Sequence, residues 1–227
     1  SLSGVSINGG GSNDTLAVTG GSSDISGAVL SAIENITLDT GLNATMTIAQ
    51  NALVTTAAGT NTITLSNGGT TTGAAQVEAY VLADAASNDL TLGASGQSVT
   101  GTGTQNDIVR TGAQTVISGT INLGGGATDQ LIISSTDTNI STAALTDVEQ
   151  VNLDNAVNAT MTIAQNALVT TAAGTNTITL SNAGTATARA TVENYKLANG
   201  TNTFNLHEDT DSVVGGTGID VIQTNSL

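Results

Sequence analysis

The 227-residue chain contains no cysteine, no proline and no tryptophan, and only three aromatic residues in all. Without cysteine it forms no disulfides and offers no thiolate ligands to a metal. A thiol-free acidic chain survives oxidising conditions without cross-linking, so we expect an extracellular protein. The lack of proline beside abundant Val, Ile and Thr argues against disorder, because disordered chains are rich in proline and poor in β-branched residues.

Basic residues are also scarce. Three Lys and Arg stand against 18 Asp and Glu, which gives a formal net charge of −15. This balance argues against a nucleic-acid partner, whose phosphates are neutralised by Lys and Arg. It argues equally against docking on anionic lipid through polybasic segments. No apolar run approaches the roughly 18 residues of a membrane-spanning helix, so we expect no membrane insertion.

The most informative feature is an internal repeat with an offset of 115 residues. The segment Asn43–Asn67 recurs letter for letter as Asn158–Asn182, and shorter matches extend the similarity on both sides. The sequence therefore predicts two tandem β-repeat modules, residues 1–115 and 116–227. Catalytic sites are rarely duplicated in this way, whereas repeats are common in proteins that act through length or multivalency.

Short segments in which apolar and polar residues alternate recur throughout both repeats, and this period of two indicates strands with one buried face. In the first repeat the predicted strands are Thr15–Val18, Asn35–Leu38, Thr45–Ile48, Thr62–Leu65, Tyr80–Ala83, Leu90–Leu92 and Ile108–Arg110. Ile25–Ile33 and Ile140–Val148 carry Ala and Leu at near-helical spacing. They predict either one short helical turn or a corner of small residues.

Small side chains and few aromatics favour an all-β fold of the parallel β-solenoid type. A solenoid needs only thin layers of Val, Ile, Leu and Ala, stacked one rung on the next. A β-sandwich core depends more on large residues such as Trp and Tyr. Because the strand spacing is irregular, β-sandwich modules remain the alternative.

Residues 215–223 read GGTGIDVIQ, which fits the calcium-binding nonapeptide GGxGxDxUx in full. In such turns, backbone carbonyls and the aspartate supply oxygen ligands for Ca²⁺. The predicted ligands here are Gly215, Gly216, Gly218 and Asp220. Degenerate copies of the turn end in Asp14, Asp107 and Asp129, which we also assign to calcium. The alternative is an ordinary turn in which the aspartate bonds nearby backbone.

With these turns, and with the segment ALTDVEQVNL at Ala144–Leu153, the chain resembles the repeats-in-toxin class of secreted bacterial proteins. It resembles more closely the Gly/Thr/Ala-rich S-layer and adhesin β-strand repeat proteins. The resemblance implies calcium-dependent folding after secretion, export without an N-terminal signal peptide, and assembly on the cell surface. Nonapeptides of that class stand in tandem, whereas here each is isolated, so we expect half-sites completed by another rung or another subunit.

Threonine pairs spaced Thr-x-Thr recur in both repeats, as in Thr62 and Thr64. Alternate residues of a strand share a face about 7 Å apart, so stacked rungs would present a grid of threonines. Such a grid suggests a module that binds ice or glycan. The plainer interpretation is that threonine fills solvent-facing strand positions because it is polar and β-branched.

The residues that could support catalysis are few and scattered. Tyr80 and Tyr195 match across the repeat and fit core positions with outward hydroxyls better than sugar platforms. The dense acidic segment His207–Asp211 predicts an exposed turn. We find no nucleophile–histidine–acid arrangement and expect no enzymatic activity.

The sequence thus predicts a secreted structural protein of the cell surface that assembles into a surface layer or filament, stabilised by Ca²⁺. Its partners would be further copies of itself, stacked head to tail or in a lattice, and cell-surface polysaccharide. The alternative is a binding module with a Thr-rich face.

Overall fold

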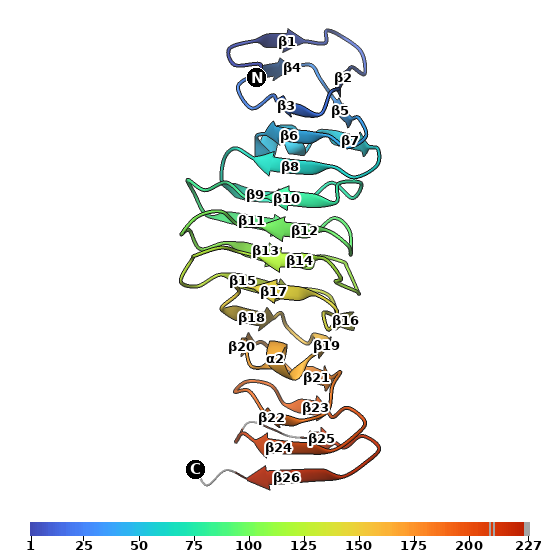
Figure 1. Cartoon of the computed structure of the whole chain (residues 1–227), viewed down its shortest axis with the longest axis vertical. Helices are drawn as coiled ribbons and strands as arrows, with labels where there is room; N and C mark the ends of the chain where they lie inside the picture. Colours follow the sequence, from blue (N-terminus) through green and yellow to red (C-terminus); the bar gives the residue numbers. More distant parts are fainter. Residues whose placement is uncertain (209, 211, 225–227) are drawn as a thin grey trace.

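A computed structural model describes residues 1–208, 210 and 212–224. The chain forms a β-solenoid of about 11 turns, and its paired strands run parallel. The rungs stack along one axis, with the two termini at opposite ends (Figure 1). The predicted parallel β-solenoid is confirmed. The β-sandwich alternative is wrong, because its sheets are antiparallel.

Two long sheets and four shorter ones make up the walls of the solenoid. The seven-stranded sheet contains β3 (Ser22–Asp24), β6 (Asn43–Met46), β8 (Thr62–Leu65), β10 (Ala79–Val81), β12 (Ser98–Thr100), β14 (Thr120–Asn122) and β17 (Ala144–Thr146). The six-stranded sheet contains β9 (Gly69–Thr72), β11 (Asn88–Thr91), β13 (Ile108–Arg110), β15 (Gln130–Ile133), β18 (Gln150–Leu153) and β20 (Val169–Ala172).

The shorter sheets complete the three walls that each full turn of the chain visits. At the N-terminal end lie β1 (Ser6–Asn8) with β4 (Val29–Ser31), and β2 (Thr15–Val18) with β5 (Asn35–Leu38) and β7 (Val54–Ala57). Toward the C-terminal end lie β16 (Thr138–Asn139), β19 (Asn158–Met161), β21 (Thr177–Leu180), β23 (Asn194–Lys196) and β25 (Ser212–Val214) in one sheet. The last sheet contains β22 (Thr185–Thr187), β24 (Asn202–Leu206) and β26 (Asp220–Thr224).

The core is a stack of inward-facing side chains, one or two on most strands. In the seven-stranded sheet, Ile63 pairs with Tyr80, Tyr80 with Val99, and Val99 with Ile121. All four are buried. Each inward side chain therefore packs on its counterpart one rung away, about 4.8 Å distant. A thin core of this kind is filled by medium-sized aliphatic residues, which explains how the chain folds with so few aromatics.

Four predicted strands have their predicted bounds, and the other three differ by one or two residues at each end. The sheets run through the boundary between the two sequence repeats without a break, because β12 pairs with β14 and β13 with β15. The structure is accordingly one continuous stack of rungs.

Two short helices, α1 (Ile48–Asn51) and α2 (Ile163–Asn166), lie at equivalent places in the two repeats. A capping box closes the N-terminus of α1: the Thr47 hydroxyl accepts the Gln50 N–H, and Gln50 Oε1 accepts the Thr47 N–H. The helical turn predicted within 25–33 and 140–148 is wrong, because β4 and β17 lie there. In the described part of the chain no helix is long and apolar enough to cross a membrane.

Candidate functional site

The predicted calcium-binding aspartates stand where the chain enters a strand, and they do so in three different sheets: the six-stranded sheet for Asp107 and Asp129, the sheet of β2 for Asp14 and the sheet of β26 for Asp220. We call this set of strand-entry positions the acidic corner; only its central residues are stacked along one wall. Each of its residues lies at the first position of a strand or immediately before it. They are Asp14, Glu34, Asn88, Asp107, Asp129, Glu149, Asn202 and Asp220.

At the centre of the acidic corner, carboxylates tie four successive rungs together. Asp107 Oδ1 accepts both the backbone N–H and the Nδ2–H of Asn88, each at 2.9 Å. Asp129 Oδ1 accepts the Asp107 N–H at 2.6 Å, and Glu149 accepts the Asp129 N–H at 2.9 Å. Each carboxylate thus receives a backbone donor from the preceding rung, and the corner helps to fix the register of the sheet.

This arrangement places two buried carboxylates on adjacent rungs, since Asp107 and Asp129 are 2% and 0% exposed. Desolvation raises the pKa of the Asp107 carboxyl above its usual value, although the hydrogen bonds from Asn88 oppose the shift. Desolvation also raises the pKa of Asp129, and the negative charges of Glu149 and Asp107 raise it further. The corner therefore holds its central charges at a cost in stability.

Some oxygens of the acidic corner are buried without a hydrogen-bond partner, namely Asp14 Oδ2, Asn88 Oδ1 and Asp129 Oδ2. Ca²⁺ takes six to eight oxygen ligands. In the described residues, no three His, Cys, Asp or Glu side chains are grouped so that they could hold a metal. The predicted aspartates lie on four different rungs, so they do not form one calcium cage within the chain, and calcium binding stays a prediction.

The three predicted glycine ligands have close neighbours that leave no room for a side chain. A Cβ on Gly215 would collide with the Asp220 carboxylate, and one on Gly216 would collide with the Ala198 carbonyl. Gly218 lies against the Gly200 carbonyl and has a φ of +135°. Backbone packing between rungs is thus sufficient to require glycine at 216 and 218, whereas the neighbour of Gly215 is the end of a side chain in its own rung. Asp220 Oδ1 accepts the Nδ2–H of Asn202.

A second set of strand-entry positions, equivalent in the two repeats, pairs an asparagine with a glutamate on the next rung in the seven-stranded sheet and again in the sheet of β19. We call this the asparagine–glutamate corner, and its residues are Asn61, Glu78, Asn176 and Glu193. Asn61 accepts the Leu42 N–H at 2.9 Å and donates Nδ2–H to the Ala58 carbonyl at 2.8 Å. Glu78 accepts the Asn61 N–H at 2.7 Å, and Glu193 accepts the Asn176 N–H at 2.8 Å. The same network therefore occurs in both repeats.

The two matched tyrosines are core residues, as predicted, but their hydroxyls are not directed outward. Tyr80 accepts the Ala74 N–H at 2.7 Å and donates to Asn51 Oδ1 at 3.0 Å. Tyr195 makes the equivalent bonds to Arg189 and Asn166. Burial raises the pKa of the Tyr195 hydroxyl to about 12. Each hydroxyl is therefore hydrogen-bonded inside the molecule, to a backbone N–H and to the asparagine that ends a short helix, and it does not need to reach solvent.

Columns of small, mostly polar side chains lie on the outer face of the seven-stranded sheet, and one of them is rich in threonine. One column follows the register Thr45, Thr64, Val81, Thr100, Asn122 and Thr146. A parallel column follows Asn43, Thr62, Ala79 and Ser98. Neighbouring residues are about 4.8 Å apart between rungs and about 7 Å apart along a strand. The grid is regular, but residues other than threonine interrupt it.

Sequence reasoning found the aspartates of the acidic corner and missed the residues that bond to them, chiefly Asn88, Asn202 and Glu34. It also missed the asparagine–glutamate corner. A usable signal was present, because a polar residue stands just before each alternating strand, and Glu34 matches Glu149 across the repeat. In the acidic segment that follows β24, Asp209 and Asp211 lie outside the described residues.

Comparisons with known protein families, curated proteins and solved structures found no match to this chain.

Proposed function

We propose that this chain is an extracellular structural protein that assembles with further copies of itself into a surface layer or filament. The observation that carries the proposal is the exposure of apolar side chains on the rungs at both ends of the described solenoid. Val5 is 41% exposed beside β1 at one end, and Ile222 is 44% exposed at the other. Strand edges with exposed apolar residues pair readily with another chain.

The regularity of the stack supports the same proposal. Solenoid repeats contact only their neighbours, so added repeats extend the structure without changing its inner rungs. Contacts between unlike ends of identical units generate open fibres. In this proposal the 115-residue repeat is the unit of growth, and the two repeats act as tandem modules. Cell-surface polysaccharide would anchor the assembly.

Calcium is proposed to act between copies and not in a closed cage within one chain. The net charge of −15 makes acidic copies repel each other, and divalent ions relieve such repulsion. Asp14 and Asp220 extend the acidic corner to the two end rungs, where another copy would approach.

Light scattering and negative-stain microscopy test this function. The purified chain is examined over a range of concentrations, in millimolar calcium and then in excess chelator, while far-UV circular dichroism follows its β-structure. We expect concentration-dependent fibres or sheets that calcium favours. A folded monomer under all of these conditions would contradict assembly. If excess chelator leaves the assembly unchanged, the proposed role of calcium is wrong while self-assembly stands.

The threonine columns favour a second candidate function, a module that binds ice or glycan through the outer face of the seven-stranded sheet. Thermal hysteresis of the monomer, or retention on a glycan array, would support it. Thr64→Tyr and Thr100→Tyr would disrupt the face without reaching the core. If these variants keep full binding, the face is not the binding surface.

A further inference from the structure

The rung at the C-terminal end is the structural counterpart of a rung in the middle of the molecule. Val213 of β25 pairs with Tyr195, as Val99 of β12 pairs with Tyr80. Likewise β26 pairs with β24 through Ile222, as β13 pairs with β11 through Val109. The β25–β26 rung therefore occupies, in the second repeat, the place of the β12–β13 rung in the first.

The N-terminal rung is related to the middle of the molecule in the same way. Ile7 of β1 pairs with Leu30, as Ile121 of β14 pairs with Leu145. Leu16 of β2 pairs with Ile36 of β5, as Leu131 of β15 pairs with Val151 of β18 one repeat later. The β1–β2 rung is accordingly the counterpart of the β14–β15 rung.

These two middle rungs pack directly on each other. β12 pairs with β14 through Val99 and Ile121, and β13 pairs with β15 through Val109 and Leu131. All four side chains are fully buried. The chain therefore contains, at its centre, the contact that its own two end rungs would make if they met.

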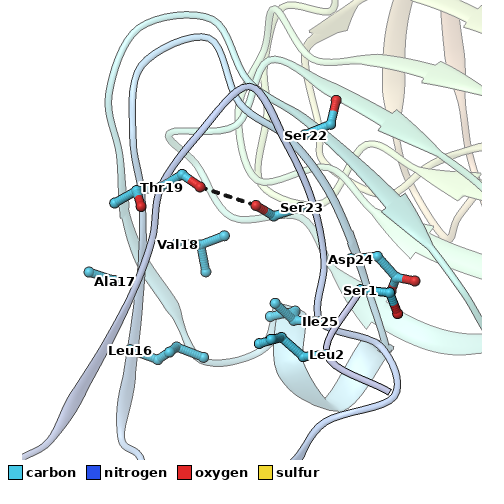
Figure 2. Close-up of a pocket in the computed structure, with 10 residues that line it drawn as sticks. All are labelled: Ser1, Leu2, Leu16, Ala17, Val18, Thr19, Ser22, Ser23, Asp24 and Ile25. Carbon is cyan, nitrogen blue, oxygen red and sulfur yellow. Dashed lines mark hydrogen bonds between the residues drawn. The ribbon is translucent and has the colours of Figure 1, made fainter. Parts of the chain in front are cut away.

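The end rungs lack this cover. Leu131 is fully buried, but its counterpart Leu16 is only half-buried and lines an open pocket of about 240 Å³ at the N-terminal end. Figure 2 shows that Leu2, Leu16, Val18 and Ile25 are grouped around this pocket. At the other end Ile222 is 44% exposed, whereas its counterpart Val109 is fully buried. Each end presents the apolar layer that the other would cover.

Polar groups at the two ends are also complementary. The counterpart of Asp14 in the middle of the molecule is Asp129, whose Oδ1 accepts the N–H of Asp107. The counterpart of Asp107 at the C-terminal end is Asp220. The Asp220 N–H is thus placed to bond to the Asp14 carboxylate when one end rung covers the other.

We infer that the C-terminal rung of one copy docks on the N-terminal rung of a second copy in the register of the central rungs. Val213 then packs on Ile7, Ile222 packs on Leu16, and the Asp220 N–H bonds to the Asp14 carboxylate. The two copies form one continuous solenoid. This inference rests on the proposed self-assembly and names the surfaces and the register that it uses.

Disulfide trapping tests the register, because the chain has no cysteine of its own. In the central contact Ile108 pairs with Gln130, which predicts that Val221 of one copy lies opposite Thr15 of the next. The Cα atoms of such a pair are about 5 Å apart, within the range for a disulfide. Thr15→Cys and Val221→Cys are therefore made as separate variants, mixed in equal amounts and oxidised gently.

The matched control pairs Val221→Cys with Ala17→Cys, two residues along β2. That displacement places the Cα atoms about 8 Å apart, too far for a disulfide. All three positions are exposed or nearly so, so the variants should fold normally. We expect the matched mixture to give at least tenfold more cross-linked dimer than the displaced mixture on a non-reducing gel.

Light scattering of the same proteins under reducing conditions separates the two proposals. If large species form but the matched pair cross-links no better than the displaced pair, the inferred junction is wrong and self-assembly stands. If no association is detected at any concentration and neither mixture cross-links, both are wrong. Selective trapping of the matched pair together with association in solution supports both.

Discussion

The two polar corners of the solenoid solve the same problem with different charges. In each, a side chain before a strand accepts a backbone N–H from the preceding rung. The asparagine–glutamate corner sets a neutral amide beside each glutamate, as with Asn61 and Glu78. The acidic corner stacks Asp107, Asp129 and Glu149 on three successive rungs.

The difference shows that two contributions of a corner side chain are separate: its acceptor oxygen fixes the strand register, and its charge changes the stability of the fold. Any side-chain oxygen of the right length holds the register, because the ladder needs only an acceptor. Like charges one rung apart repel, however, and burial strengthens that repulsion. Desolvation raises the pKa of both Asp107 and Asp129, and at Asp129 the charges of Glu149 and Asp107 add to the increase. The asparagine–glutamate corner places a neutral amide beside each glutamate instead. We therefore expect equivalent substitutions in the two corners to have opposite effects.

The largest expected effect comes from making the asparagine–glutamate corner resemble the acidic one. Asn61→Asp places a buried carboxylate next to Glu78 and removes the Nδ2–H donor to the Ala58 carbonyl. Asn61 is fully buried. We expect a loss of about 3 kcal/mol in the free energy of unfolding at pH 7, since a buried charge and an unsatisfied carbonyl are both introduced. Urea denaturation followed by circular dichroism measures it.

Asn67→Asp is the matched control for that variant. Asn67 is exposed and lies in the same repeated segment, and its Oδ1 accepts the Ile48 N–H, which a carboxylate would also accept. The added charge is the same, so its effect should stay within about 0.5 kcal/mol. Equal losses in the two variants would show that overall charge, and not the corner, limits stability.

A smaller effect of opposite sign is expected for Asp129→Asn. The amide oxygen keeps an acceptor for the Asp107 N–H while the stacked charge is removed. We expect a gain of about 0.5–1 kcal/mol at pH 7. Because the folded-state pKa of Asp129 is raised, the native protein holds this proton more tightly than the unfolded chain does. The wild type therefore gains stability from this group as the pH falls from neutral toward 3.8, and the variant lacks that gain.

Thermal unfolding at pH 7, 5 and 4 measures this difference. Asp39→Asn removes one negative charge from an exposed residue and serves as the control for net charge. If Asp39→Asn changes the pH profile as much as Asp129→Asn does, general repulsion and not the acidic corner explains the pH dependence.

The local part of this architecture was predictable, and the part that depends on stacking was not. Alternation alone places the strand at Thr62–Leu65, because the signal lies within four residues. The capping box of Thr47 and Gln50 is also a local signal in the sequence. The spacing of small residues nevertheless placed the predicted helical turn within 25–33 and 140–148. The partnership of Asp107 and Asp129 joins residues 22 positions apart. Rung lengths vary, so no fixed sequence spacing reveals which side chains meet at a corner.

The smallest and most discriminating effect is expected for a pair of glutamates. Glu149→Gln and Glu193→Gln each keep an oxygen that can accept the same backbone N–H. Glu149 faces the Asp129 carboxylate, so its neutralisation should stabilise the fold by about 0.5 kcal/mol. Glu193 faces the neutral Asn176, so its neutralisation only weakens a charge-assisted hydrogen bond and should destabilise by about 0.5 kcal/mol. Urea denaturation of both variants under identical conditions measures the two changes in the free energy of unfolding. If both changes have the same sign, the neighbour on the adjacent rung does not decide what a corner charge contributes to stability.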